Sequence, residues 1–295
     1  MSNRKENDRS IVTTARQWFH KTLVSRGVLV IDQQGIPSNS DKDNKPSCAI
    51  GKLIARKLSA KSGRKLPAQT AGSIFEELVC EFIRRTFPKL QHLRPGKWMV
   101  ENLGNANAIK MSAFVQYEHL AHLEKVVRAD HQLATMLGND YVIAPDIVVA
   151  RHPCSDDEIN AVAKIVDDRV CLRTDIREKN NAHEIMHASV SAKWTMRSDR
   201  AQNSRTEALN LIRNRKGHLP HVVVVTGEPL PSRLASLALG TGDIDCVYHF
   251  ALHELIEAVE EYGKDGREDL IEQLMTMING KRLRDISDLP LDLSC

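Results

Sequence analysis

The stretch from residue 187 to residue 217 constrains the fold most, because its hydrophobic period changes partway along. Apolar and polar residues alternate over residues 187–194, as is typical of a half-buried β-strand. Farther on, apolar residues recur at the spacing of one helix face: Ala208, Leu209, Leu211 and Ile212. Gly217 follows, where a helix C-terminus commonly needs a left-handed residue. The stretch therefore predicts a strand that leads into a helix.

Positive charge is concentrated in the same stretch. From Lys193 to Lys216 the chain has seven basic residues against two acidic ones, whereas the whole chain carries a net charge of only +3. The total is too small to indicate a nucleic-acid partner by itself. Because clustered Lys and Arg attract phosphate, the local excess of positive charge predicts a phosphate-bearing ligand.

The rest of the chain alternates between helices and strands. The spacing of apolar residues predicts helices over residues 9–26, 49–58, 71–87, 112–137 (with a candidate break near Asp130), 252–259 and 270–278. Continuous apolar runs predict buried strands over residues 141–150, 222–225 and 246–250. This alternation predicts an α/β fold.

No secretory or membrane segment is expected. The N-terminus is charged and has no apolar core, and no apolar run approaches the roughly 18 residues that span a membrane. The six cysteines are scattered without a C-x-x-C pair, which argues against a zinc ribbon and for reduced thiols. With 42% hydrophobic and 27% charged residues, the chain is expected to be a soluble cytoplasmic protein.

Two residues on predicted strands have the types needed for metal-assisted phosphodiester hydrolysis. Asp146 follows Pro145 in one strand, and Lys193 lies near the end of another. A carboxylate can hold a divalent cation that polarises phosphate and acidifies a bound water, while a Lys stabilises developing charge. Pro-Asp is also common at turns, and an exposed Lys is usually just solvated, so the pair alone is a weak indication.

The acid expected two residues before Lys193 is replaced by Ser191. Glu207, on the following predicted helix, is a candidate to supply the missing carboxylate. The same glutamate also completes the pattern Ser204-x-x-Glu207, which is typical of a capping box at a helix N-terminus. The residues alone do not decide between the two interpretations.

Several motifs together resemble the type II restriction endonucleases that recognise sites with a CCGG core. These are Lys193-x-x-x-Arg197-Ser198-Asp199-Arg200, Pro145-Asp146 upstream and Glu207 downstream, with further similarity over residues 66–72, 210–217, 237–252 and 279–293. The resemblance covers nearly the whole chain. It implies an α/β, PD-(D/E)xK restriction-endonuclease-like fold with a central mixed sheet flanked by helices. Residues 1–295 would form one domain, with a mainly helical part over 1–110 and a catalytic and recognition core over 111–295.

The resemblance also implies the activity. It predicts a magnesium-dependent enzyme, with two Mg2+ ions per active site, that cleaves double-stranded DNA at GCCGGC and leaves 5′ overhangs. It implies a homodimer that assembles into a homotetramer. A cognate DNA methyltransferase is expected in the same system, because an unprotected host genome would be cut.

The resemblance assigns roles to named residues. The catalytic set is Asp146, Lys193, Glu207, Glu76 and Ser191, with Asp146 and Glu207 as metal ligands. Base reading falls to Arg197, Asp199 and Arg200, and reading of the outer base pair to Gln69 and Arg233. Arg donates two hydrogen bonds to guanine and Asp accepts one from cytosine, which suits a palindrome of cytosines followed by guanines. The alternative is a helix N-terminus with Asp199 in its first turn.

Two other classes of function remain as alternatives. Residues 183–187 read His-Glu-Ile-Met-His, the zinc protease pattern H-E-x-x-H, which requires a helix. These residues adjoin a predicted strand, so the protease is disfavoured. A non-catalytic DNA-binding regulator would need the basic segment but not the buried Asp146.

Overall fold

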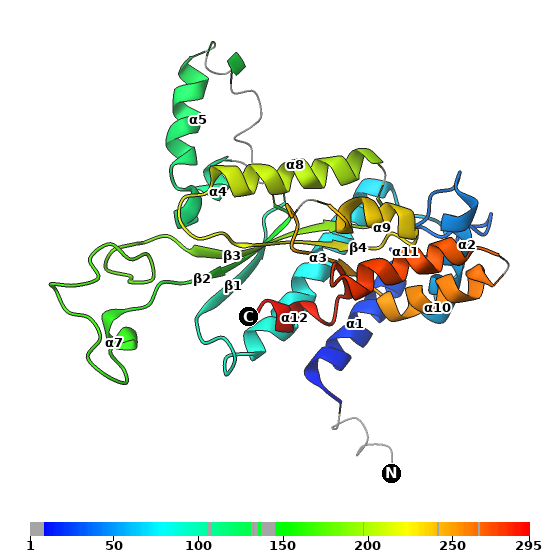
Figure 1. The fold of residues 1–295 in the computed structure, drawn as a ribbon, viewed down its shortest axis with the longest axis horizontal. Coiled ribbons are helices and arrows are strands. Elements are labelled where there is room, and N and C mark those ends of the chain that lie inside the picture. Colours follow the sequence, from blue (N-terminus) through cyan, green and yellow to red (C-terminus); the bar gives the residue numbers. More distant parts are fainter. Residues whose placement is uncertain are drawn as a thin grey trace. The chain divides into compact units, whose positions relative to one another are not determined.

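A computed structural model of the protein describes residues 9–104, 108–130, 132, 135–136, 145–196, 198–240, 242–264 and 266–295 (Figure 1). The chain divides into two compact units. Unit 1 comprises Met1–Arg94, Ser191–Arg205 and Val222–Cys295, and unit 2 comprises Pro95–Val190 and Thr206–His221.

Unit 1 contains most of the helices. They are α1 (Ile11–Ser25), α2 (Lys45–Lys57), α3 (Ala68–Thr86), η1 (Phe87–Lys89), α9 (Pro231–Ala238), α10 (Leu252–Gly263), α11 (Glu268–Asn279) and α12 (Leu289–Asp292). Its strands are β4 (His221–Thr226), whose first residue belongs to unit 2, β5 (Cys246–His249) and β6 (Leu283–Asp285). β4 pairs with β5 and β5 with β6, both in parallel. The near-continuous apolar sequence of β4 is typical of a strand covered on both faces.

Unit 2 contains an antiparallel set of strands. They are β1 (Trp98–Asn102), β2 (Ile147–Arg151) and β3 (Ile185–Lys193), whose last three residues belong to unit 1. The described helices here are α4 (Ala108–Met111), η2 (Val115–Tyr117), α5 (Leu120–Ala129) and α7 (Asp156–Ile159). α8 (Ser198–Asn214) begins in unit 1 and ends in unit 2. The sheet order is β1-β2-β3-β4-β5-β6, which confirms the predicted α/β fold with a mixed sheet flanked by helices.

The helix predicted over residues 112–137 is wrong at its start, whereas the break near Asp130 is confirmed because α5 ends at Ala129. Residues 115–117 form the short helix η2, and α5 begins only at Leu120. The reason lies in tertiary hydrogen bonds. Val115 N donates to the carbonyl of Glu184, and the Gln116 amide bonds both backbone polar groups of Met186. Residues 114–116 thus lie along the beginning of β3. None of the helices in the described part of the chain has both the length and the apolar composition of a membrane span.

A buried ion cluster connects α1 to α10 and β6 within unit 1. Arg16 donates to Glu254 at 2.6 Å and to Asp285 at 2.9 Å, and the Asp285 side chain is only 1% exposed. Burial raises the pKa of Asp285, but the hydrogen bonds and charge of Arg16 outweigh burial and lower it to about 2. The guanidinium therefore keeps the Asp285 carboxylate ionised inside the unit.

Replacing Arg16 with Met removes the charge while retaining an extended side chain. We expect the free energy of unfolding in urea to fall by about 3–5 kcal/mol, because Asp285 loses the partner of a buried pair. Arg128→Met is the control, since its exposed pair with Glu124 on α5 contributes about 1 kcal/mol or less. Equal losses in both variants would contradict the assigned role of Arg16.

The same substitution has a pH signature. Because the folded-state pKa of Asp285 lies below its ordinary value of 3.8, its contribution to stability is present above about pH 4 and lost as pH falls towards 2. In Arg16→Met, this part of the acid-induced loss of stability should shrink.

Candidate active site

The C-terminal end of β3 carries two residues of the predicted catalytic set. Ser191 and Lys193 are both half-buried and lie two residues apart, so their side chains share one face of the strand. Ala192 and Trp194 are buried on either side of Lys193 in the sequence. The alternation predicted for residues 187–194 is therefore the alternation that directs Lys193 and Ser191 to a common side.

Trp194 anchors this end of the strand within unit 1. Its ring lies 5.1 Å from Phe75 on α3 and 5.3 Å from Phe250. At Gly227, a Cβ atom would lie 2.5 Å from Trp194 Cε3 and 2.7 Å from the Trp194 carbonyl oxygen, so only glycine fits. Gly227 N also donates to the carbonyl of Lys193 at 3.2 Å. The backbone of the candidate catalytic lysine is thus held by packing and by a hydrogen bond.

α3 brings two further predicted residues to the same unit. Glu76 is half-buried and directly follows Phe75, whose ring contacts Trp194 next to Lys193. Gln69 is exposed in the first turn of α3. The two lie seven residues apart, about two helical turns, so they occupy one face of the helix. Glu76 and Lys193 are therefore carried by elements that pack on each other.

The first predicted metal ligand, Asp146, precedes β2 in unit 2. Its carbonyl accepts from Leu103 N at 2.9 Å, and its side chain is half-buried. In the antiparallel pairing of β2 with β3, Ile147 is the partner of Val190. Asp146 immediately precedes Ile147 along the chain, and Ser191 immediately follows Val190. Asp146 and Ser191, the serine that replaces the usual acid, are therefore each adjacent in sequence to one residue of the Ile147–Val190 pair.

Glu207, the second predicted metal ligand, lies within α8 and is half-buried. α8 begins at Ser198, so Ser204 and Glu207 lie inside the helix rather than at its N-terminus. The capping-box interpretation of Ser204-x-x-Glu207 is therefore wrong.

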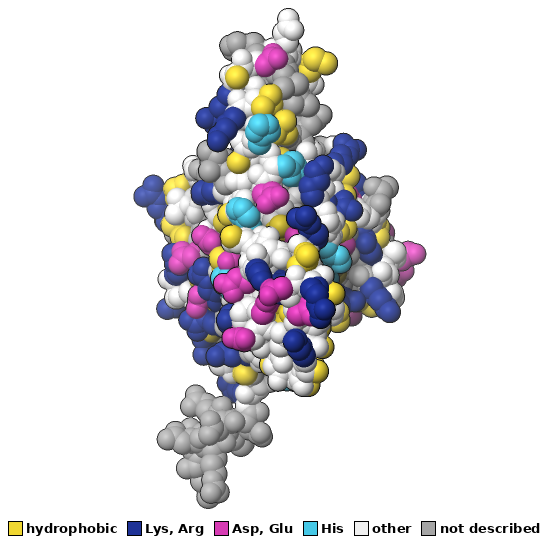
Figure 2. Space-filling view, turned by 90° about the vertical axis from the view of Figure 1, so that its left-hand side faces the viewer, with side chains coloured by type: hydrophobic (Ala, Val, Ile, Leu, Met, Phe, Trp, Pro, Cys, Tyr) yellow, Lys and Arg dark blue, Asp and Glu magenta, His cyan; other side chains and the backbone are white. Residues whose placement is uncertain are grey.

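The three residues predicted to read the CCGG core lie where the structure describes little. Arg197 lies outside the described residues, and Asp199 and Arg200 are in the first turn of α8 without described side chains. The helix-start interpretation of Asp199 therefore stays open. On the face shown in Figure 2, basic, acidic and histidine side chains are interspersed, so charge of one sign does not dominate that face.

A buried polar group beside the recognition segment was missed by the sequence analysis. Glu228 is fully buried, and its carboxylate accepts from Met196 N at 3.0 Å and from Leu230 N at 3.1 Å. Arg233 donates to the Met196 carbonyl at 3.0 Å and pairs with Asp41. Burial raises the pKa of Glu228 to about 7. A charged residue that directly follows an apolar strand, between Gly227 and Pro229, was the available signal.

The H-E-x-x-H pattern does not form on a helix. Residues 183 and 184 precede β3, and His187 lies within it. His183 approaches Glu118, Glu184 pairs with His152 at 2.6 Å, and the His187 ring lies 5.0 Å from that of His221. The two histidines therefore do not share a helix face, unlike the i and i+4 pair of a zinc protease.

Comparison with known proteins identifies close relatives of this chain. The family model of the NgoMIV restriction enzyme matches residues 19–295. The type II restriction enzyme NgoMIV of Neisseria gonorrhoeae is 47% identical over 285 residues, covering 96% of this chain and 99% of the relative. A crystal structure of the type IIF restriction endonuclease Bse634I with cognate DNA covers 88% of this chain and 92% of its own, at 13% identity and a TM-score of 0.36.

Proposed function

Because the chain belongs to the NgoMIV restriction enzyme family, we propose that it hydrolyses double-stranded DNA at the palindrome GCCGGC and leaves 5′ overhangs. The observation that carries this proposal is the match of a type II restriction enzyme over 96% of the chain. The matched range includes Asp146, Lys193 and Glu207. The chain is therefore a restriction endonuclease, and its site and cut position are the finer part of the proposal.

Asp146 and Glu207 are proposed to hold Mg2+, with two ions per active site. Both side chains offer the hard anionic oxygens that this cation prefers, whereas Ser191 offers only a neutral hydroxyl. When bound, the metal supplies positive charge for the phosphate and lowers the pKa of a water. Glu76, beside the contact between α3 and β3, adds a further carboxylate to the catalytic set.

Lys193 is proposed to orient the attacking water and to donate to the phosphate as negative charge develops. Its backbone is fixed by Gly227 and by the packing of Trp194. A catalytic group that is held in place before the reaction avoids the cost of reorganisation during it. The anchored strand end suits this role.

The bases of the CCGG core are proposed to be read by Arg197, Asp199 and Arg200. Arg binds guanine O6 and N7, and Asp accepts from cytosine N4. Gln69, exposed on α3, and Arg233 are proposed to read the outer base pair. Arg233 already uses two of its donors on Met196 and Asp41, and a guanidinium has five.

Incubation with plasmid DNA and Mg2+, followed by sequencing of the fragment ends, tests the proposal. We expect 5′-extended ends within GCCGGC. Lys193→Ala is the control: it should bind the same duplex but cleave it orders of magnitude more slowly, because the lysine charge acts mainly in the transition state. Ends that lack CCGG would overturn the proposed specificity, and binding without cleavage would favour a DNA-binding regulator.

A second prediction separates Glu207 from Ser191. Glu207→Ala should abolish cleavage while leaving metal-free DNA binding intact, because the cation loses a carboxylate ligand. Adding Ser191→Glu should restore a measurable fraction of cleavage. Because Glu207 lies inside α8 and does not cap it, we expect the variant to remain folded, as measured by thermal unfolding. Full cleavage by folded Glu207→Ala at limiting magnesium would contradict the assignment.

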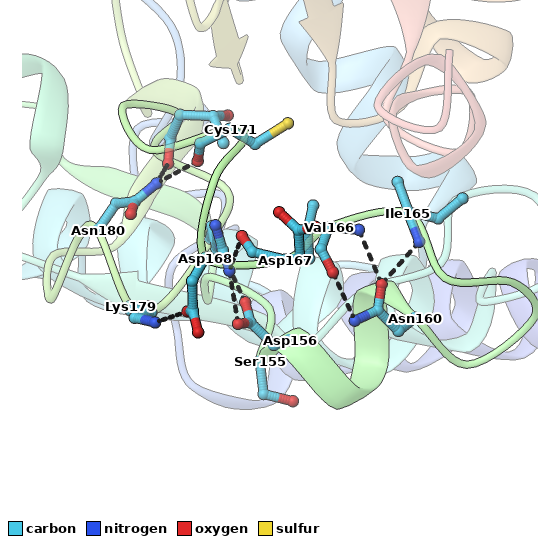
Figure 3. A network of polar contacts seen from close by, with 12 residues as sticks. Ser155, Asp156, Asn160, Ile165, Val166, Asp167, Asp168, Cys171, Lys179 and Asn180 are labelled. Carbon is cyan, nitrogen blue, oxygen red and sulfur yellow. Dashed lines mark hydrogen bonds and ion pairs between the residues drawn. The ribbon is translucent and has the colours of Figure 1, made fainter.

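The protein is also proposed to assemble as a homodimer and then a homotetramer, and to act beside a cognate DNA methyltransferase. The segment between β2 and β3 in unit 2, residues 152–184, is proposed as a surface for this assembly. Hydrogen bonds and ion pairs within it are shown in Figure 3. The fully buried Arg177 pairs with Asp156 at 2.7 Å and donates to the carbonyls of Asp167 and Val170. The segment is thus internally braced.

This braced segment exposes apolar side chains. Val162 is 100% exposed and Ile165 61%, and Val170 and Leu172 are about half exposed. A contiguous apolar patch in water is typical of a surface that another protein covers, and we propose that these side chains form one. A second copy of this chain is the partner that the proposed tetramer supplies.

Replacing Val162 and Ile165 together with Asp should convert tetramers into dimers, as measured by analytical ultracentrifugation. Two carboxylates in a dehydrated interface are costly, whereas in the separate dimers both positions remain in water. Leu93→Asp, at an exposed apolar position outside the segment, is the control and should leave the assembly unchanged. A double variant that remains tetrameric would exclude this surface.

A further inference from the structure

The short connection between Lys193 and α8 is held by two side chains of opposite charge, all within unit 1. Met196 N donates to Glu228 Oε2, and the Met196 carbonyl accepts from Arg233 Nη1, each at 3.0 Å. Arg233 Nη1 lies 3.8 Å from Glu228 Oε2. The N–H and C=O groups of Met196 are therefore both hydrogen-bonded, by two side chains that form an ion pair with each other. Met196 lies three residues after Lys193 and directly before Arg197.

Glu228 and Arg233, which we call the Met196 clamp, are themselves held by residues of other elements. The second oxygen of Glu228 accepts from Leu230 N, and Glu228 N donates to Thr226 Oγ1 at 3.2 Å. Arg233 extends from α9 to Asp41, in the loop before α2. The position of Met196 is therefore fixed relative to β4, α9 and the loop before α2. The residues adjacent to Met196 in sequence are not alone in determining it.

We propose that Glu228 is a positioning residue for DNA reading, which with Arg233 holds Met196 so that Lys193 and the first turn of α8 keep a fixed spacing. Glu228 itself is fully buried, so its carboxylate is not on the surface that DNA would meet. The inference rests on the proposed function of this segment. It predicts that discrimination between cognate and unrelated DNA depends on a residue outside both the catalytic and the base-reading sets.

Protonation of Glu228 would weaken the hydrogen bonds by which the Met196 clamp holds Met196. The ionised carboxylate accepts from two backbone N–H groups, whereas the neutral acid has a hydroxyl that donates, so one N–H group loses its best acceptor. The pKa of Glu228 is raised to about 7 by burial, although bonds from Met196 and Leu230 and the charge of Arg233 lower it. Asp41 is the other charged group that acts on it, and it raises the pKa. The clamp is therefore complete above about pH 7 and weakens as pH falls through 7.

The test measures affinity without metal, by fluorescence anisotropy, for a duplex containing GCCGGC and for a scrambled duplex between about pH 6 and about pH 8.5. For the wild-type protein, the ratio of the two affinities should fall about ten-fold as pH drops through 7, the worth of roughly one hydrogen bond. Glu228→Gln is permanently neutral and should show the low ratio at every pH. Glu257→Gln, at an exposed glutamate paired with Lys57, should keep the wild-type profile.

Each outcome decides the inference. A Glu228→Gln protein with the wild-type ratio at high pH overturns it. If thermal unfolding shows that Glu228→Gln does not fold, the wild-type profile decides, and a ratio that stays constant across this pH range overturns the inference. A wild-type protein with no preference for GCCGGC at high pH overturns the proposed specificity instead, whereas a preference that is independent of pH overturns the inference alone.

Discussion

The packing of Trp194 is the contact on which the candidate catalytic lysine depends. Its ring lies against Phe75 and Phe250, and its backbone leaves no room for a side chain at residue 227. Interiors packed at this density do not deform continuously, so a strand end held in this way keeps one position. Lys193, the preceding residue, inherits that position through its backbone. The apolar contact of Trp194 therefore helps to fix the position of the Lys193 backbone, a role that hydrogen bonds have for many catalytic residues.

Two residues after Trp194, buried charge holds the chain in place of apolar packing. Met196 is held by Glu228 and Arg233, and a buried acid of this kind is costly unless its oxygens are bonded. Here both oxygens are used, yet burial still raises the pKa of Glu228 to about 7. The raised pKa lowers the free energy of unfolding at neutral pH, because Glu228 releases its proton more readily in the unfolded chain than in the folded one. Such a cost is reasonable where it fixes the geometry of a functional segment.

Local patterns predicted the elements whose sequence alone decides their structure. The alternation at residues 187–194 became β3, the valine run became β4, and Gly217 has the left-handed φ of +75° that its position indicated. The patterns failed where a distant residue decides. Gln116 interrupts a helical pattern because it bonds Met186, and Glu228 is important only through its bonds to Met196. Most of the fold could be predicted, but of the site only its residue types.

The displaced acid has a consequence for how reading and cleavage are connected. In the proposed function, Asp199 and Arg200 read bases from the first turn of α8, and Glu207 binds metal from farther along the same helix. An α-helix transmits a shift of its first turn along its axis, because its hydrogen bonds resist local extension. An acid at Ser191 would instead be placed by the strand, independently of the recognition residues. In the proposed function, a metal-binding carboxylate on α8 would make metal binding depend on contacts between the first turn and the bases, which would favour cleavage at a correctly read site.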